Sequence, residues 1–270
     1  MAENKVFISL GGGCDIASNL KRLKISNSTL FFDYLWNLDD GLKSVVKILD
    51  ENFSSFTQKE YFIRTYHERF NKEVFVNVHF PNIAFIHYDM ASSKAFSSFV
   101  RKINRMRKLL SSDKEIVFLY YRLHSEPINS NYKANIHDKM LFFLEESKYF
   151  VNYLNNSQPN LLFNLHCIFL KPLDNESQTS QEIDSFFAKR INDRERLGDK
   201  IKFSTGYERN DESQEKNKVS LDRWNEILLT PKKEMPPKLR QKIYKALIGN
   251  KFYKKQSWYE ILNKKVKKSS

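Results

Sequence analysis

The chain has only 7 glycines and 2 cysteines among its 270 residues, and none of its apolar stretches is long. Two cysteines cannot form the disulfide framework of a small secreted domain, so we expect reduced thiols and a reducing compartment. No apolar run approaches the roughly 20 residues that a membrane-spanning helix needs. The N-terminal segment lacks a basic leader followed by an apolar stretch and a cleavage site, so we expect no signal peptide and a cytoplasmic location.

Acidic residues are scarce at the C-terminal end, so most of the net positive charge is concentrated there. The formal net charge is +13 at pH 7, and residues 231–270 contain 13 Lys and Arg but only 2 Glu. Residues 1–230 are therefore nearly neutral, and the high isoelectric point does not predict a specific nucleic-acid groove. We expect an α/β domain over 1–230 and a basic, aromatic helical tail over 231–270. Such a tail could bind the anionic inner face of a membrane or an acidic partner. The sequence is equally consistent with a run of solvated charges that binds nothing.

Short apolar runs alternate along the chain with stretches in which apolar residues have helical spacing. The expected strands are rich in Val, Ile, Phe and Tyr and cover residues 5–10, 74–78, 83–87, 116–121, 161–170 and 200–204. Helical spacing is found over residues 42–49, 96–110, 140–150, 183–197 and 224–228. This alternation predicts an α/β fold, a layered domain with a mostly parallel central sheet flanked by helices. The loops that follow the strands would share one edge of that sheet, where sites of such folds gather.

Three of the seven glycines, Gly11, Gly12 and Gly13, stand together after an apolar run, and Cys14 and a helix-like stretch follow them. This order predicts a strand, a tight turn and a helix that begins at a thiol. Amides at a helix start are unpaired and carry a partial positive charge, which stabilises a thiolate. Cys14 is thus the candidate nucleophile, with a small buried filler as the equally weighted alternative. The turn from Gly11 to Asp15 is a candidate oxyanion or anion site, although Asp15 would repel an anion or cap the helix.

A nucleophilic thiol needs a base within reach, and the base needs an orienting group. We rank His87 first among the six histidines because it closes an expected strand, with His124 second and His79 third. Asp33 lies in an apolar stretch, where a carboxylate needs a partner. It would orient the base, bond a backbone turn or pair with Arg122.

The sequence gives less support to a second reactive cysteine, a metal or nucleotide site, or a function other than thiol catalysis. Cys167 lies inside an apolar run and is expected to be buried and inert. No spacing of Cys and His fits a zinc site and no phosphate-loop or dinucleotide signature is complete, so no cofactor is expected. A second hypothesis is a transferase or binding domain in which the glycine turn and Arg122 hold a phosphorylated or glycan-linked ligand. A third is an interaction protein that works through its basic tail.

The opening segment resembles a known family. The matching residues are Ser9, Leu10, Gly11, Cys14, Ala17, Leu20, Phe32 and Asp33, with Phe31 and Tyr34 where that family has proline and tryptophan. The segment is similar to the domain-of-unknown-function family DUF1796, which is described as papain-like cysteine peptidases. The similarity is specific over residues 5–36, extends loosely to about residue 230 and does not cover the tail. It implies a cysteine nucleophile at Cys14 with a histidine partner, for which His87 is the best match. Our first hypothesis is therefore a hydrolase or acyl transferase that acts on a peptide, acyl or glycan-linked substrate.

Overall fold

The computed structural model describes residues 5–26, 28–37, 39–128, 133–172, 177–191, 200–207, 223–224 and 226–228. Contacts within the chain divide it into two units, residues 1–227 and 228–270, and of the second unit only Leu228 is described. The expected basic tail therefore lies outside the described residues. The domain limits at residue 230, and the membrane or acidic partner of the tail, stay predictions.

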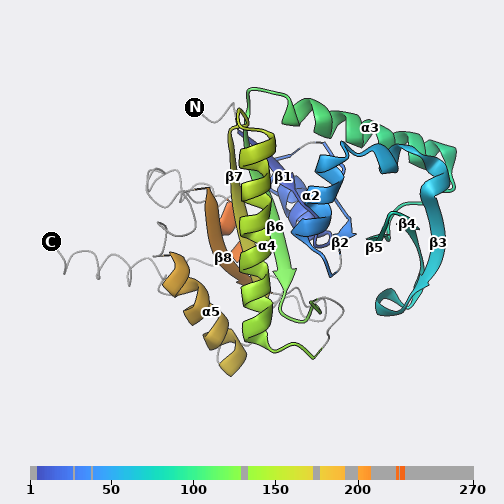
Figure 1. The fold of residues 1–270 in the computed structure, drawn as a ribbon. Coiled ribbons are helices and arrows are strands. Elements are labelled where there is room, and N and C mark those ends of the chain that lie inside the picture. Colours follow the sequence, from blue (N-terminus) through green and yellow to red (C-terminus); the bar gives the residue numbers. More distant parts are fainter. Residues whose placement is uncertain are drawn as a thin grey trace, which may run out of the picture. The chain divides into compact units, whose positions relative to one another are not determined.

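A parallel sheet forms the centre of the first unit (Figure 1). Within the described residues its four strands follow the order β1 (Lys5–Ser9), β6 (Glu115–Leu123), β7 (Phe163–Lys171) and β8 (Ile201–Tyr207), and every neighbouring pair is parallel. Strands of a parallel sheet are covered on both faces, which explains why β6 and β7 are buried along almost their whole length.

The helices lie against this sheet and against one another. Helix α1 (Asp15–Arg22) contacts β1 and β6, whereas α4 (Ile136–Ser157) and α5 (Gln178–Ile191) contact β7 and β8. Helix α2 (Leu42–Asp50) packs on α4, which crosses the face of the sheet in Figure 1. The predicted α/β fold with a parallel sheet between helices is confirmed. No helix in the described part of the chain is long and apolar enough to cross a bilayer.

A second, antiparallel sheet was not expected from the sequence. Its described strands follow the order β2 (Trp36–Asn37), β5 (Phe80–Phe85), β4 (Lys72–Asn77) and β3 (Phe62–His67). The strands that precede His79 and His87 therefore belong to this sheet and not to the parallel one. Strand β3 was missed because it is an edge strand with exposed, charged side chains and no continuous apolar run. Short 3-10 helices cover Ser54–Thr57, Lys59–Tyr61 and Glu68–Phe70.

Helix α3 (Ser93–Leu110) joins the second sheet through aromatic packing. Its apolar residues Phe99, Ile103 and Met106 recur at helical spacing and are buried. The ring centre of Phe99 lies 5.2 Å from that of Phe31 and 5.4 Å from that of Phe85, distances at which aromatic rings attract one another. This packing holds the loop around Phe31 and the end of β5 against α3, and so positions the residues of the site described next.

Candidate functional site

The glycine turn after β1 leads directly into Cys14, the residue that precedes α1. Gly11, Gly12 and Gly13 have φ angles of +90°, +86° and +140°, which side chains of L-residues rarely adopt. The amide of Gly11 donates to the Ser9 hydroxyl at 3.4 Å, and the amide of Gly12 donates to the side-chain oxygen of Asn37. Both amides are thus engaged within the chain, so we leave them out as donors to an anion.

Gly12→Ala is expected to lower the free energy of unfolding by about 2–3 kcal/mol. A Cβ at position 12 would lie 2.5 Å from the main-chain oxygen of Tyr121 in the central strand β6, and the positive φ adds strain. Urea unfolding followed by circular dichroism measures the loss. Gly206→Ala is the control, because its Cβ would meet side-chain ends alone, the nearest being Leu170 Cδ2 at 2.7 Å, without a positive φ. A loss at Gly12 no larger than at Gly206 would contradict this account.

Cys14 lines a pocket to which four segments of the chain contribute. The pocket has a volume of about 380 Å³, and its lining residues are Cys14, Ser18, Tyr34, His87, Tyr88 and Lys102. Cys14 is half-buried at the start of α1, and its carbonyl accepts the amide of Ser18 at 2.9 Å in the first helical turn. His87 lies exposed in the turn after β5. The predicted nucleophile and the first-ranked histidine therefore line the same pocket.

Tyr34 and His87 lie side by side in this pocket. Their rings pack edge to face with centres 5.9 Å apart, and Tyr34 has a φ of +66°, which is rare for a residue other than glycine. Burial, and then the negative charges of Asp33 and Cys14, raise the pKa of the Tyr34 hydroxyl, so it stays protonated at neutral pH. Burial and the positive charge of Lys72 lower the pKa of His87 below its ordinary value of 6.5. The imidazole is therefore neutral at pH 7 and able to accept a proton.

The carboxylate of Asp33 is engaged in its own backbone turn. Its Oδ2 accepts the amide of Leu30 at 2.8 Å, and its main-chain oxygen accepts the hydroxyl of Tyr88 at 3.1 Å. Burial raises the pKa of Asp33 to about 6, and the Leu30 hydrogen bond offsets part of that rise. Among the described residues no hydrogen bond or ion pair joins Asp33 to His87 or to Arg122. Of the three roles expected for Asp33, the structure places it in that of bonding a turn.

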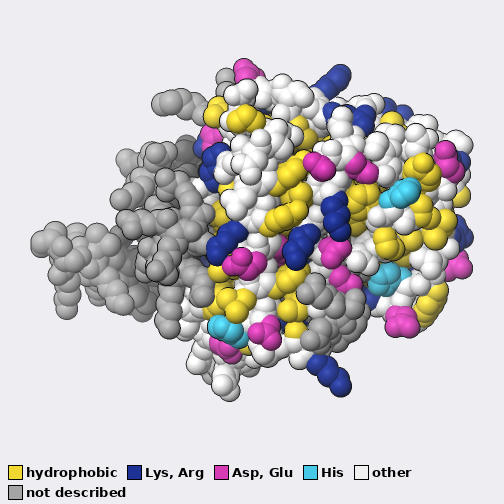
Figure 2. Space-filling view, in the orientation of Figure 1, with side chains coloured by type: hydrophobic (Ala, Val, Ile, Leu, Met, Phe, Trp, Pro, Cys, Tyr) yellow, Lys and Arg dark blue, Asp and Glu magenta, His cyan; other side chains and the backbone are white. Residues whose placement is uncertain are grey.

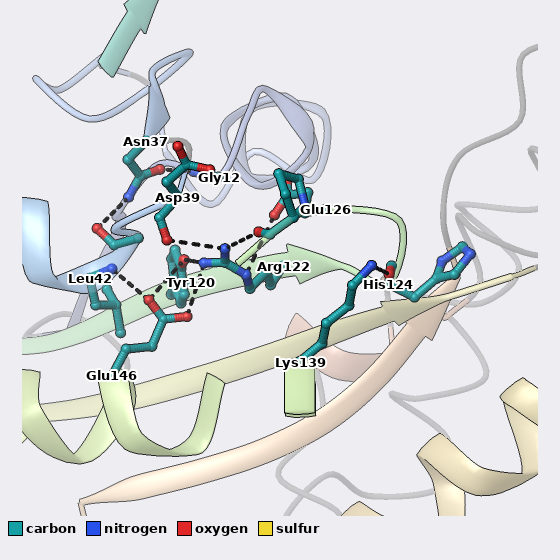
Figure 3. A network of polar contacts seen from close by, with 12 residues as sticks. Gly12, Asn37, Asp39, Leu42, Tyr120, Arg122, His124, Glu126, Lys139 and Glu146 are labelled. Carbon is teal, nitrogen blue, oxygen red and sulfur yellow. Dashed lines mark hydrogen bonds and ion pairs between the residues drawn. The ribbon is translucent and has the colours of Figure 1, made fainter. Parts of the chain in front are cut away.

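Arg122 lies in a buried polar network away from the pocket (Figure 3). Its side chain is 2% exposed, with Nη1 3.3 Å from Glu146 Oε1 and Nε 3.9 Å from Glu126 Oε2. Its Nη2 donates to the main-chain oxygens of Asp39 and Pro127 at 3.3 Å and 2.8 Å. Carboxylates within the chain balance its charge, so we do not include Arg122 in the candidate site.

The other candidate histidines and the second cysteine lie outside the pocket. His79 packs its ring against Tyr61, with centres 4.6 Å apart, and the main-chain oxygen of His124 accepts Lys139 Nζ at 2.9 Å. Cys167 is fully buried in β7, and burial raises the pKa of its thiol. Neither cysteine is in a disulfide.

Sequence reasoning did not assign four of the pocket residues, Ser18, Tyr34, Tyr88 and Lys102. The two tyrosines directly follow Asp33 and His87 in the chain, and that adjacency was the available signal. Lys102 is one of several basic residues in α3, and no spacing distinguishes it from the others.

The segments that build this pocket coincide with a match to a family of proteins. The family model described as "Putative papain-like cysteine peptidase (DUF1796)" matches residues 5–141. This span is half of the chain, and it includes Cys14, His87 and Lys102. The chain belongs to the DUF1796 family. The resemblance noted in the sequence is thereby confirmed. No match was found among curated proteins or among solved structures.

Proposed function

We propose that this DUF1796 protein is a cysteine-dependent hydrolase of the peptidase type, with Cys14 as the nucleophile and His87 as the general base. The observation that carries the proposal is that a half-buried thiol at a helix start and a neutral imidazole line one pocket. The positive end of the helix dipole favours a thiolate at that position. Membership of the DUF1796 family supports the peptidase type over other uses of a reactive thiol.

The proposed reaction has two steps. The sulfur of Cys14 bonds to the carbonyl carbon of the scissile amide, its proton passes to His87, and the carbonyl π electrons move onto oxygen. When the oxyanion collapses, the carbon–nitrogen bond breaks and His87 returns the proton to the departing amine. Water then attacks the thioester and His87 takes its proton. The carbon–sulfur bond breaks to release the acid, and His87 returns the proton to the sulfur of Cys14.

The remaining groups of the site support these steps in our proposal. The positive end of the α1 dipole, next to Cys14, stabilises the oxyanion. Asp33 is a positioning residue, because it holds the turn that precedes Tyr34 and accepts the hydroxyl of Tyr88. Asp15 lies in the first turn of α1, where a carboxylate interacts favourably with the helix dipole.

We expect kcat/KM to decrease as the pH is lowered, with the midpoint of the decrease below pH 6.5. His87 accepts a proton only when it is neutral, and its folded pKa lies below its ordinary value, so activity is lost as the pH falls through that lowered pKa. Lys72→Gln removes a positive charge that depresses this pKa and should move the midpoint upward by about 0.2–0.5 pH unit at low salt. Hydrolysis of a fluorogenic peptide substrate across pH 4–8 measures the midpoint. Lys148→Gln, on α4, is the matched control, and a shift of equal size there would contradict the assignment of His87.

The alternative use of the glycine turn, as the phosphate or glycan site of a transferase or binding domain, has less support. It needs donors to an anion, whereas the amides of Gly11 and Gly12 donate within the chain. It also needs a cation such as Arg122, whose guanidinium is paired with Glu146. We therefore do not adopt it.

A further inference from the structure

Helix α3 carries several positively charged side chains and no negatively charged ones. Its 18 residues include six basic and no acidic side chains. Lys94, Arg101, Arg105 and Lys108 follow one another at intervals of 7, 4 and 3 residues, which places them on one face of the helix, and all four are exposed. Among the described residues none of the six forms an ion pair, whereas exposed lysines on other helices do. We call these four residues the α3 basic row.

Lys102 connects the α3 basic row to the pocket of Cys14. Its Nζ donates to the Tyr88 hydroxyl at 2.9 Å and lies 4.3 Å from the centre of that ring. Lys102 is the one lysine or arginine among the six described residues that line the pocket, and none of the six is Asp or Glu. The nearby carboxylate of Asp33 is hydrogen-bonded to the Leu30 amide, and its charge acts on Lys102 without a direct ion-pair contact among the described residues. The ammonium group lines the pocket, where a negative group on a ligand can reach it.

The α3 basic row also runs beside the loop that carries Tyr34. Arg105 Nη2 donates to the main-chain oxygen of Thr29 at 2.6 Å, which ties the row to that loop. Lysine and arginine side chains are seen along the top of the view in Figure 2, over the region where Figure 1 draws α3. From Lys94 to Lys108 the helix rises about 21 Å, which matches about six residues of an extended peptide.

We propose that Lys102 and the α3 basic row bind an acidic polypeptide substrate, with one carboxylate of the substrate on Lys102 and others along α3. That the ligand is a polypeptide rests on the proposed function, whereas its negative charge follows from the charges of α3 and the pocket. Unpaired surface charges of one sign steer and hold ligands of the opposite sign, and they do so less at high salt.

Binding by the full chain carrying Cys14→Ser tests this proposal, because that variant separates binding from cleavage. The probes are three fluorescein-labelled peptides of twelve residues that differ only in bearing four Glu, four Gln or four Lys. Fluorescence anisotropy at 25 and 200 mM salt is expected to show the Glu peptide bound about tenfold more tightly than the Gln peptide at low salt. Arg101→Gln/Lys108→Gln should weaken the Glu peptide about five- to tenfold. Lys47→Gln/Lys148→Gln removes the same charge from α2 and α4 and should leave its affinity within about twofold.

Several outcomes would count against the proposal. Equal affinities for the three peptides, or equal losses in the two double variants, would show that α3 does not recognise negative charge. A further contrary result is that the chain binds a single-stranded oligonucleotide or phosphatidylserine vesicles more tightly than the Glu peptide. If Arg101→Gln/Lys108→Gln weakened that binding, the α3 basic row would be assigned to a different ligand. Cleavage of peptides by the unmodified chain without any preference for Glu would overturn this inference and leave the proposed function standing. Binding of the Glu peptide without its cleavage by the unmodified chain would support this inference and contradict the proposed function.

Discussion

Cys14→Ala is expected to reduce kcat/KM for a peptide substrate by a factor on the order of 10⁴ or more, because a covalent mechanism has no route without its nucleophile. The thiol is half-buried at the start of α1, so its loss removes little packing, and we expect the fold to be unchanged. Cleavage of a fluorogenic peptide library measures activity, and circular dichroism checks the fold. A Cys14→Ala chain that is folded and fully active would exclude the proposed mechanism.

The chain supplies an internal control for the reactivity of this thiol. Iodoacetamide at pH 7 should modify Cys14 rapidly and leave Cys167 unmodified in the folded protein. Cys167 is fully buried and burial raises the pKa of its thiol, so both access and ionisation protect it. Mass spectrometry of the digested chain reads the two sites separately and needs no knowledge of the substrate. Modification of both cysteines at similar rates, with the fold retained, would contradict an activated Cys14.

The local part of the site could be predicted from the sequence because its signals are contiguous. An apolar run, three glycines and a helical stretch occupy residues 6–23, so the strand, the turn and the helix start at Cys14 follow from neighbouring residues. The hydrogen bond of Asp33 is similarly local, since its partner Leu30 is three residues away. His87, which the structure places in the pocket of Cys14, was ranked first among the histidines because it closes an expected strand.

The non-local part could not be predicted, because nothing in the sequence pairs residues that are far apart. Arg122 was assigned to an anion site, and its partner Glu146 lies 24 residues later in a helix whose polar residues resemble a solvated face. The second sheet was missed for the related reason that β3 is held by its hydrogen bonds to β4 and not by an apolar run of its own. Lys102 reaches the pocket only because Phe99 packs α3 against the second sheet.

The pair formed by Arg122 and Glu146 carries the largest expected effect on stability. The carboxylate of Glu146 is fully buried, and its Oε2 accepts the amide of Leu42 at 2.8 Å and the hydroxyl of Tyr120 at 3.3 Å (Figure 3). Burial raises the pKa of Glu146 to about 7, and Arg122 offsets part of that rise. Removing one partner of a buried ion pair strands the other charge in a medium of low dielectric constant.

Glu146→Leu is therefore expected to lower the free energy of unfolding by about 3–5 kcal/mol. Arg122 cannot release its proton, so its guanidinium stays charged and, among the described residues, keeps only the more distant Glu126 as a negatively charged partner. Arg122→Met should cost less at acidic pH, because Glu146 can take up a proton and become neutral. The double variant Arg122→Met/Glu146→Leu should be more stable than Glu146→Leu alone. Urea unfolding of the three variants measures these differences, and additive losses would contradict a direct interaction.

The pH dependence of Arg122→Met distinguishes a charged pair from simple loss of packing. Without Arg122 the folded pKa of Glu146 should lie further above its ordinary value of 4.5. A carboxyl with a raised folded pKa binds more protons in the folded state, so stability falls as the pH rises between the unfolded and the folded pKa. We expect both proteins to lose stability from pH 4.5 to about pH 7, and Arg122→Met to go on losing stability above about pH 7, where the curve of the unmodified chain levels off. Parallel curves above about pH 7 would mean that Arg122 contributes packing alone, whereas a continued fall in Arg122→Met requires that the charge of Arg122 favours ionisation of Glu146 in the core.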